Sequence, residues 1–249
     1  MGGMNRLEEW RTGLSAAADT ITYLRRHSGL PGPRGNLELV QAAADFGSEP
    51  DFRTWIAIGS GDDPTDEFLV VCGVVGVGRL AAEGRTDVIE ELRAHAADPR
   101  WRVREGVAMA LQRLGDADVW RLMDTAADWA NHGPYVQRAA IAGVAEPRLL
   151  KTREAAELAV DVVDRVTSSL ATAADRRSDE FRTLRQALAY CWSVVAAAAP
   201  VLGKARMEFW ATSPDRDVRW ILTENLKKAR LVRLDPDWVE GMKAALADR

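Results

Sequence analysis

The stretch ADPRWRVREGVAMALQRLGD, residues 97–116, decides the fold class. Asp98 and Pro99 stand before a run in which apolar residues recur at intervals of three and four. That spacing places them on one face of an α-helix. A similar phrase, TSPDRDVRWILTENLKKARL, returns at residues 212–231. Two phrases of the same kind at separate places in the chain indicate a repeated helical unit.

The rest of the chain has the same helical periodicity and almost no strict alternation of apolar and polar residues. Residues 153–171 place their apolar side chains on one stripe, which predicts an amphipathic helix. Residues 180–198 are apolar nearly all round and predict a central helix. Shorter helices are expected at 37–46 and 51–58.

Turn-forming residues separate these segments. Gly, Pro, Asn and Asp cluster at residues 30–36, 59–66, 131–134, 145–147 and 213–215. We expect Asn36, Thr65, Asp98 and Ser213 to cap the helices that follow, since each stands just before apolar periodicity begins. The glycine-rich run GVVGVGRL, 73–80, has neither the spacing nor the Lys-Ser/Thr pair of a phosphate loop, and it predicts close helix packing instead.

A repeat emerges when the phrases are aligned on one apolar position. Leu69, Val103, Val136, Leu184 and Val218 occupy that position, with successive spacings of 34, 33, 48 and 34 residues. A period of about 34 residues accommodates two helices and two turns, and the longer interval carries the long helix at 153–172. The sequence therefore predicts an all-α fold, a right-handed α-solenoid of stacked helix pairs.

The repeated phrase resembles the HEAT repeat. Asp-Pro-x-x-x-Val-Arg followed by Leu seven residues after the Arg is the pattern that carries the resemblance, which covers about 65–231. It implies a ladder of Asp and Arg side chains, here Asp98 with Arg104 and Asp215 with Arg219. We expect one domain over 1–249, with atypical capping helices in 1–64 and a C-terminal cap helix in 232–249, because the ends of a solenoid differ from its interior repeats.

Composition excludes several classes of protein. The formal net charge of −4 argues against a surface that is basic throughout, although one basic face is still open. The two cysteines, Cys72 and Cys191, lie far apart in apolar runs and are expected to be reduced core residues. The three histidines lack ligand spacing, so no metal and no cofactor are expected. The longest apolar run is far below the roughly 20 residues of a membrane span, and we expect a soluble, cytoplasmic chain that does not bind membranes.

Trp101 precedes Glu105 by four positions, and YVQRAAIAGV, 135–144, supplies the phrase Q-R-A-A around Arg138. These two features resemble the bacterial HEAT-like alkylpurine DNA glycosylases of the DNA alkylation repair family. The resemblance implies that Glu105 and Trp101 are catalytic, that Arg138 holds a phosphate, and that Trp192 makes a further aromatic contact. Glu105 stands where the family has Asp, which leaves both a glycosylase and a non-catalytic DNA-binding protein open.

Basic residues recur along the repeats. Residues 175–235 contain 12 Lys and Arg against 8 Asp and Glu, a net of +4. A solenoid could align such residues on its concave face and bind the DNA backbone, including that of an alkylated duplex. We expect this role for Arg102, Arg104, Arg138, Arg185 and Arg219. Two alternatives remain open: the charges belong to solvated helix faces, or the concave face binds a protein partner and the chain is a scaffold.

Overall fold

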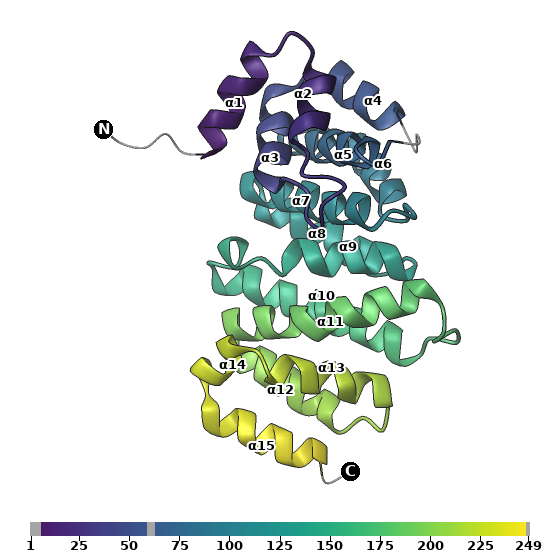
Figure 1. Cartoon of the computed structure of the whole chain (residues 1–249). Helices are drawn as coiled ribbons and strands as arrows, with labels where there is room; N and C mark the ends of the chain where they lie inside the picture. Colours follow the sequence, from purple (N-terminus) through teal and green to yellow (C-terminus); the bar gives the residue numbers. More distant parts are fainter. Residues whose placement is uncertain (1–5, 59–62, 248–249) are drawn as a thin grey trace. The chain divides into compact units, whose positions relative to one another are not determined.

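The computed structural model describes residues 6–58 and 63–247, and within these ranges the chain is all-helical, with no strand (Figure 1). The all-α prediction is therefore confirmed. The chain divides into two compact units, Met1–Ala117 and Asp118–Arg249. Each unit has its own packed helices, and the prediction of one continuous domain over 1–249 stays a prediction.

The N-terminal unit contains α1 (Arg6–Ala16), α2 (Thr20–His27), α3 (Leu37–Phe46), α4 (Glu49–Ala57), α5 (Asp66–Ala82), α6 (Val88–His95) and α7 (Trp101–Ala117). Its core is α5, which is buried along most of its length and packs against α3, α4 and α7. The glycines of α5 make this possible. A methyl group at Gly78 would lie 2.5 Å from Ala110 Cα of α7, and one at Gly73 would lie 2.7 Å from the Phe52 carbonyl oxygen of α4. The close helix packing predicted for residues 73–80 is confirmed.

Side-chain caps begin several helices, and the sequence located them in part. Asn36 accepts a hydrogen bond from the Leu39 N–H and caps α3 as predicted. Thr65 occupies the N-cap position of α5, but its side chain makes no capping hydrogen bond and its hydroxyl donates to Asp63 instead. Ser213 is not the cap of its helix. The cap is Asp215, whose carboxylate accepts hydrogen bonds from the N–H groups of the next helix. Asp98 lies three residues before α7 and accepts the backbone N–H of Arg100.

The C-terminal unit contains α8 (Val119–Trp129), α9 (Pro134–Val144), the 3₁₀ helix η1 (Pro147–Leu149), α10 (Arg153–Ala171), α11 (Asp179–Ala198), α12 (Pro200–Ala211), α13 (Arg216–Leu226), α14 (Ala229–Leu234) and α15 (Pro236–Ala247). The centre of this unit is α11, which packs against α9, α10, α12 and α13. The bounds of α10 match the predicted amphipathic helix, and α11 is the central helix expected at 180–198. In the predicted cap region 232–249, the helix α15 begins at Pro236.

Both cysteines are buried and free, as expected for core residues. Burial raises the pKa of the Cys72 thiol far above its ordinary value. None of the helices described has the length and apolar content that crossing a membrane requires.

Candidate nucleic-acid interface

Trp101 and Glu105 lie one turn apart at the start of α7, and both are exposed. Trp101 keeps 51% of its surface accessible, so it is not an inter-helix packing residue. The guanidinium of Arg102 lies 4.5 Å from the centroid of the Trp101 ring, which is cation–π geometry. The N-terminal unit therefore places an aromatic ring and a carboxylate together on the accessible side of one helix.

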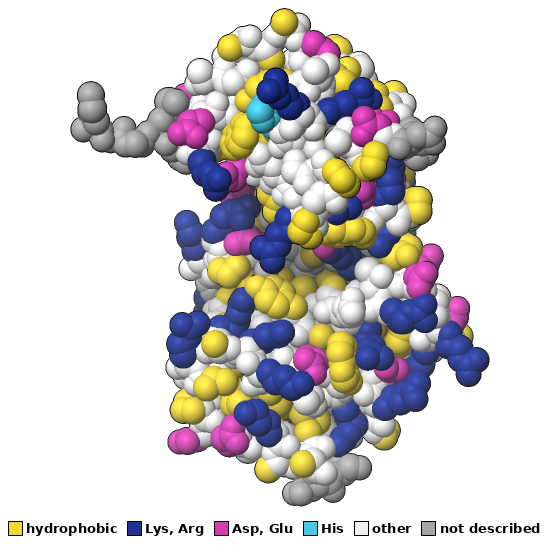
Figure 2. All heavy atoms as spheres, in the orientation of Figure 1, with side chains coloured by type: hydrophobic (Ala, Val, Ile, Leu, Met, Phe, Trp, Pro, Cys, Tyr) yellow, Lys and Arg dark blue, Asp and Glu magenta, His cyan; other side chains and the backbone are white. Residues whose placement is uncertain are grey.

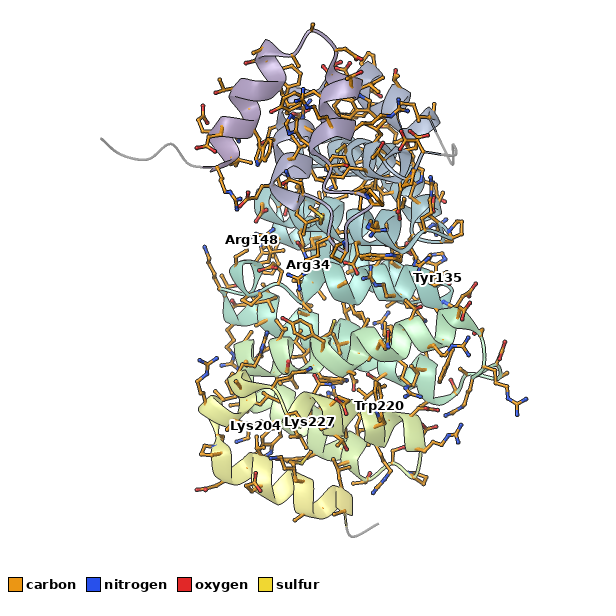
Figure 3. The ribbon with its side chains drawn as sticks, viewed as in Figure 1. Arg34, Tyr135, Arg148, Lys204, Trp220 and Lys227 are labelled. Atoms are coloured by element: carbon orange, nitrogen blue, oxygen red, sulfur yellow. The ribbon has the colours of Figure 1, made fainter. Side chains whose placement is uncertain are left out.

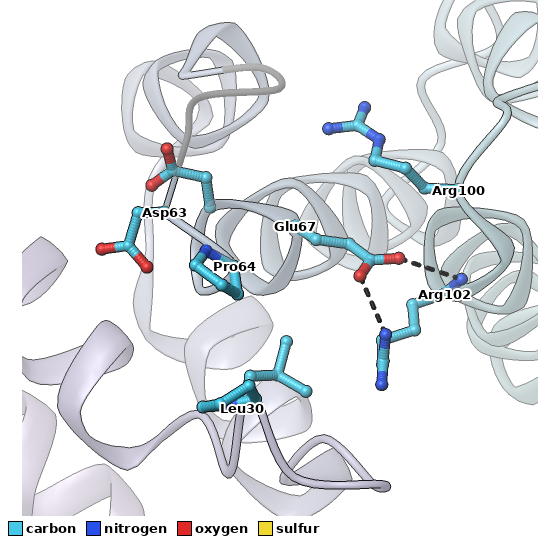
Figure 4. A pocket seen from close by; sticks show the side chains of 8 residues that line it. Leu30, Asp63, Pro64, Glu67, Arg100 and Arg102 are labelled. Atoms are coloured by element: carbon cyan, nitrogen blue, oxygen red, sulfur yellow. Dashed lines mark hydrogen bonds and ion pairs between the residues drawn. The ribbon is translucent and has the colours of Figure 1, made fainter.

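A pocket of about 220 Å³ lies beside this helix, between the N-terminal ends of α5 and α7 and the loop at residues 29–36 (Figure 4). Within it, Arg102 is paired with Glu67 at 3.0 Å, and the Glu67 carboxylate also accepts the Arg102 backbone N–H. Pairs at its edge join Arg100 to Asp98 and Arg25 to Asp66. Its positive charges are matched by carboxylates, so the pocket does not concentrate the positive charge that a phosphate group requires.

Arg104 is a buried residue and not a surface contact. Its Nη1 donates hydrogen bonds to the backbone carbonyls of Asp98 and Pro99, at 2.6 and 2.8 Å, so Arg104 holds the turn before α7. The expected ladder contact between the Asp98 carboxylate and Arg104 is replaced, because that carboxylate is paired with Arg100. Burial alone would raise the pKa of Asp98, but hydrogen bonds from Arg100 hold it below its ordinary value.

The Q-R-A-A phrase lies on α9, in the C-terminal unit. Gln137 is buried and donates hydrogen bonds to the Ala130 carbonyl and to Ser169 Oγ, both at 2.9 Å. Arg138 is half-buried on the same helix. Trp101 and Glu105 belong to the other unit, so the phosphate contact expected of Arg138 next to them stays a prediction.

The expectation that Trp192 makes a further aromatic contact with DNA is wrong, because its side chain is not accessible. It is completely buried, and its Nε1 donates a hydrogen bond to Thr167 Oγ1 at 2.9 Å. The reason is helical phase: Leu184, Leu188 and Trp192 recur every four residues along the buried stripe of α11. Trp192 is a core residue that links α11 to α10.

The expected contacts of Asp215 with Arg219 are replaced by a cluster around two aspartates. Arg176 lies between Asp215 and Asp217, at 2.6 and 3.0 Å, and Arg185 is paired with Asp217 at 2.8 Å. Arg219 instead donates a hydrogen bond to the carbonyl of Leu246 in α15. Two of the predicted backbone-binding residues, Arg185 and Arg219, therefore join helices to one another.

The accessible sides of α11, α13 and α14 form what we call the basic aromatic face. Figure 2 shows Lys and Arg side chains spread over the visible side of the C-terminal unit, and Figure 3 shows Trp220 and Lys227 on it. Tyr190 and Trp220 stand opposite the buried stripes of their helices. We include in it the accessible or partly accessible side chains of Arg182 and Tyr190 on α11, Arg216 and Trp220 on α13, Lys227 and Lys228 between α13 and α14, and Arg230 on α14.

Tyr190 is the most organised part of this face. It is 46% exposed, and Arg230 donates a hydrogen bond to its hydroxyl at 2.7 Å. The Arg230 guanidinium lies 4.9 Å from the ring centroid, and Lys228 Nζ lies 5.8 Å from it. Among the residues described, no ion pair joins Lys228 or Arg230 to a carboxylate, whereas the neighbouring Lys227 is paired with Glu224. The positive charge beside this ring is therefore uncompensated locally.

A buried asparagine makes the support of this face rigid. Asn225 of α13 is fully buried, donates a hydrogen bond to the Leu188 carbonyl at 2.9 Å and accepts one from the Ser193 N–H at 2.7 Å. Together with the pair of Arg185 and Asp217, it fixes α11 against α13. A buried polar network of this kind specifies one relative position for the two helices.

Sequence reasoning misses Tyr190 and Trp220, although a signal is present. It selects Trp192 in the aromatic-bearing helix, but the four-residue spacing from Leu184 and Leu188 already places Trp192 on the buried stripe. Tyr190, two residues earlier, then has to lie on the opposite side. Trp220 has the same relation to Val218 and Leu222, which are both buried.

The parts of the chain that the structure describes contain no group of three or more His, Cys, Asp and Glu side chains arranged to hold a metal ion. Compared with known proteins, the chain matches no protein-family model, and no curated protein is similar to it in sequence.

Proposed function

We propose that this protein binds DNA through its sugar-phosphate backbone, with the basic aromatic face as the contact surface. The observation that carries the proposal is the locally uncompensated charge of Lys228 and Arg230 beside the exposed ring of Tyr190. Phosphate groups are the ligands that such charges attract, and neutralising them releases condensed counterions from the DNA. Other cations of the face, such as Lys227 with Glu224 at 2.5 Å, already have acidic partners and contribute less.

The HEAT-like α-solenoid with a period of about 34 residues is part of the same proposal. Its support is the position of the five aligned residues, which fall one each in the helices α5, α7, α9, α11 and α13. Within the units, α5 packs against α7, and α11 packs against both α9 and α13. Stacking of every second helix is the arrangement that helix-pair repeats produce.

The link to alkylation repair rests on Trp101 and Glu105. A methylated purine carries positive charge, and a carboxylate near the sugar would stabilise the oxocarbenium-like centre that forms as the base leaves. The exposed ring of Trp101 would contact the deoxyribose beside it. Incubating methylated duplex DNA with the protein and with Glu105→Gln measures base release directly. Release that requires Glu105 would make the protein a glycosylase, and its absence in both would leave a DNA-binding protein.

The binding proposal has a sharper test in the double variant Lys228→Gln, Arg230→Gln. We expect it to lower the affinity for DNA about tenfold or more in low salt, because two phosphate groups no longer meet a cation. The matched control is Arg206→Gln on α12, whose guanidinium faces Asp161 and Asp164 of α10. Equal affinities for the double variant and the wild type would overturn the proposal.

A further inference from the structure

The basic aromatic face carries rings that a face built only for phosphate does not need. Phosphate oxygens accept hydrogen bonds from cationic side chains, and the face of an exposed ring offers them none. Yet Tyr190 is 46% exposed, and Trp220 of the neighbouring helix is half-buried. Rings beside cations are the combination with which proteins bind single strands, because bases stack on the rings while cations hold the backbone.

We infer that this face binds single-stranded DNA, with an unpaired base stacked on the ring of Tyr190. The inference rests on the proposed function and names the form of DNA that the face prefers. In a duplex the base faces are covered by their neighbours, so only a single strand can offer one to the ring.

The Tyr190 ring is held in place before any ligand arrives. Arg230 donates to its hydroxyl, and the Arg230 guanidinium and Lys228 Nζ lie 4.9 and 5.8 Å from the ring centroid. A ring with so little freedom loses little conformational entropy when a base stacks on it. The guanidinium plane adds a second flat surface, on which bases also stack.

Trp220 is organised by the same kind of contact. Arg185 lies 4.0 Å from the centroid of its ring and is itself fixed by Asp217 at 2.8 Å. The face therefore has two aromatic side chains, each with a guanidinium against it, on two helices that Asn225 joins.

The density of phosphate charge on the DNA distinguishes base stacking from purely electrostatic binding. Duplex DNA has the higher density of phosphate charge, so a face that only neutralises charge favours the duplex over a single strand. A preference for the single strand requires contacts to the bases. Such a preference is therefore the expected signature of stacking on Tyr190.

The experiment measures the binding of a fluorescein-labelled oligothymidine strand and of a hairpin duplex with the same number of phosphates. We expect the wild type to prefer the single strand, and Tyr190→Leu to weaken single-strand binding about tenfold. Duplex binding by Tyr190→Leu should change less than about twofold, since the cations remain. Tyr190→Phe keeps the ring and is expected to retain most of the affinity.

Phe209→Leu is the matched control, because it removes another exposed aromatic ring, 60% accessible, from α12. It is expected to leave both affinities unchanged. If Tyr190→Leu binds the single strand as well as the wild type does, or if the duplex is preferred, the inference is overturned while salt-dependent DNA binding still stands. If the protein binds neither the single strand nor the duplex, both the proposed function and this inference are wrong.

Discussion

Arg185 of α11 donates a hydrogen bond to the carboxylate of Asp217 in α13 at 2.8 Å. Asp217 is buried, and its carboxylate also accepts a hydrogen bond from Arg176 at 3.0 Å. A buried carboxylate shared by two guanidinium groups holds α11, α13 and the turn before α11 together. The contact gives the basic aromatic face its fixed base, and it has consequences for stability that can be measured.

Replacing Asp217 with Asn should lower the free energy of unfolding by about 3 kcal/mol, because Arg185 loses its carboxylate partner and Arg176 keeps only Asp215. The control is Asp179→Asn, since Asp179 pairs with Arg182 at the surface with 81% of its side chain exposed. That change should cost less than about 1 kcal/mol. Urea denaturation measures both, and equal losses would contradict the role assigned to Asp217.

Arg185→Gln separates structure from binding. We expect this variant to lower the melting temperature, since Arg185 holds both Asp217 and the Trp220 ring. Arg230→Gln, by contrast, should keep the melting temperature and make the slope of log affinity against log salt shallower by about 0.9, because one phosphate fewer is neutralised. Thermal melts and salt titrations of the two variants measure this. If Arg185→Gln weakened DNA binding without lowering the melting temperature, Arg185 would be a DNA-contacting residue and not a structural one.

The free energy of unfolding should fall in acid, because the carboxylate of Asp215 becomes protonated. Burial alone would raise the pKa of this carboxyl, but the hydrogen bond from Arg176 and those from the Val218 and Asp217 N–H groups hold it below the ordinary 3.8. A folded-state pKa that is lowered gives stability that is fully present above pH 3.8 and is lost as the pH falls through the lowered value.

Unfolding measured from about pH 6 down to about pH 3 tests the Asp215 prediction. Asp215→Ser keeps a side-chain oxygen that can cap α13 but has no carboxylate to titrate. The difference in stability between wild type and variant should therefore shrink in acid. A difference that is constant with pH would show that the carboxylate charge contributes nothing.

Gly78→Ala should destabilise the N-terminal unit strongly, because the added methyl group would meet the α7 backbone at Ala110 Cα, 2.5 Å away. Overpacking of this kind costs about 1–3 kcal/mol or more. Gly241→Ala on α15 is the control, since nothing lies within 4 Å of the added methyl group. Removing that helical glycine should stabilise the protein by about 0.5–1 kcal/mol. Equal effects of the two variants in thermal melts would contradict the packing described for α5.

The helices could be predicted from the sequence because they follow from local periodicity. The stretch at 153–171 forms α10 with the same bounds, and Asn36 caps α3 because a short polar side chain before an apolar run satisfies the first free N–H groups. The Asp–Arg contacts could not be predicted, since partner choice depends on three-dimensional distance. The repeat pattern predicts Arg219 as the partner of Asp215. In the structure, Arg176 contacts the two aspartates instead, although it lies forty-one residues before Asp217 in the chain.

The candidate site was predictable only in part for a related reason. Sequence identifies which residues are basic or aromatic, and helical phase identifies which sides are buried. Arg104 has the same residue type as Arg230, yet it lies inside and bonds the turn at Asp98 and Pro99, while Arg230 lies outside against Tyr190. Only the packed structure distinguishes an arginine that holds the fold from one available to a phosphate.

The most direct test of the central claim is the affinity for a fluorescent DNA duplex, plain and methylated, across a salt series. We predict binding whose affinity falls steeply and log-linearly with salt, with a slope of about −0.9 for each phosphate contacted. A preference for the methylated duplex would add support for the repair role of Trp101 and Glu105. If no DNA is bound even at low salt, the basic aromatic face is a solvated helix surface and the proposed function is wrong.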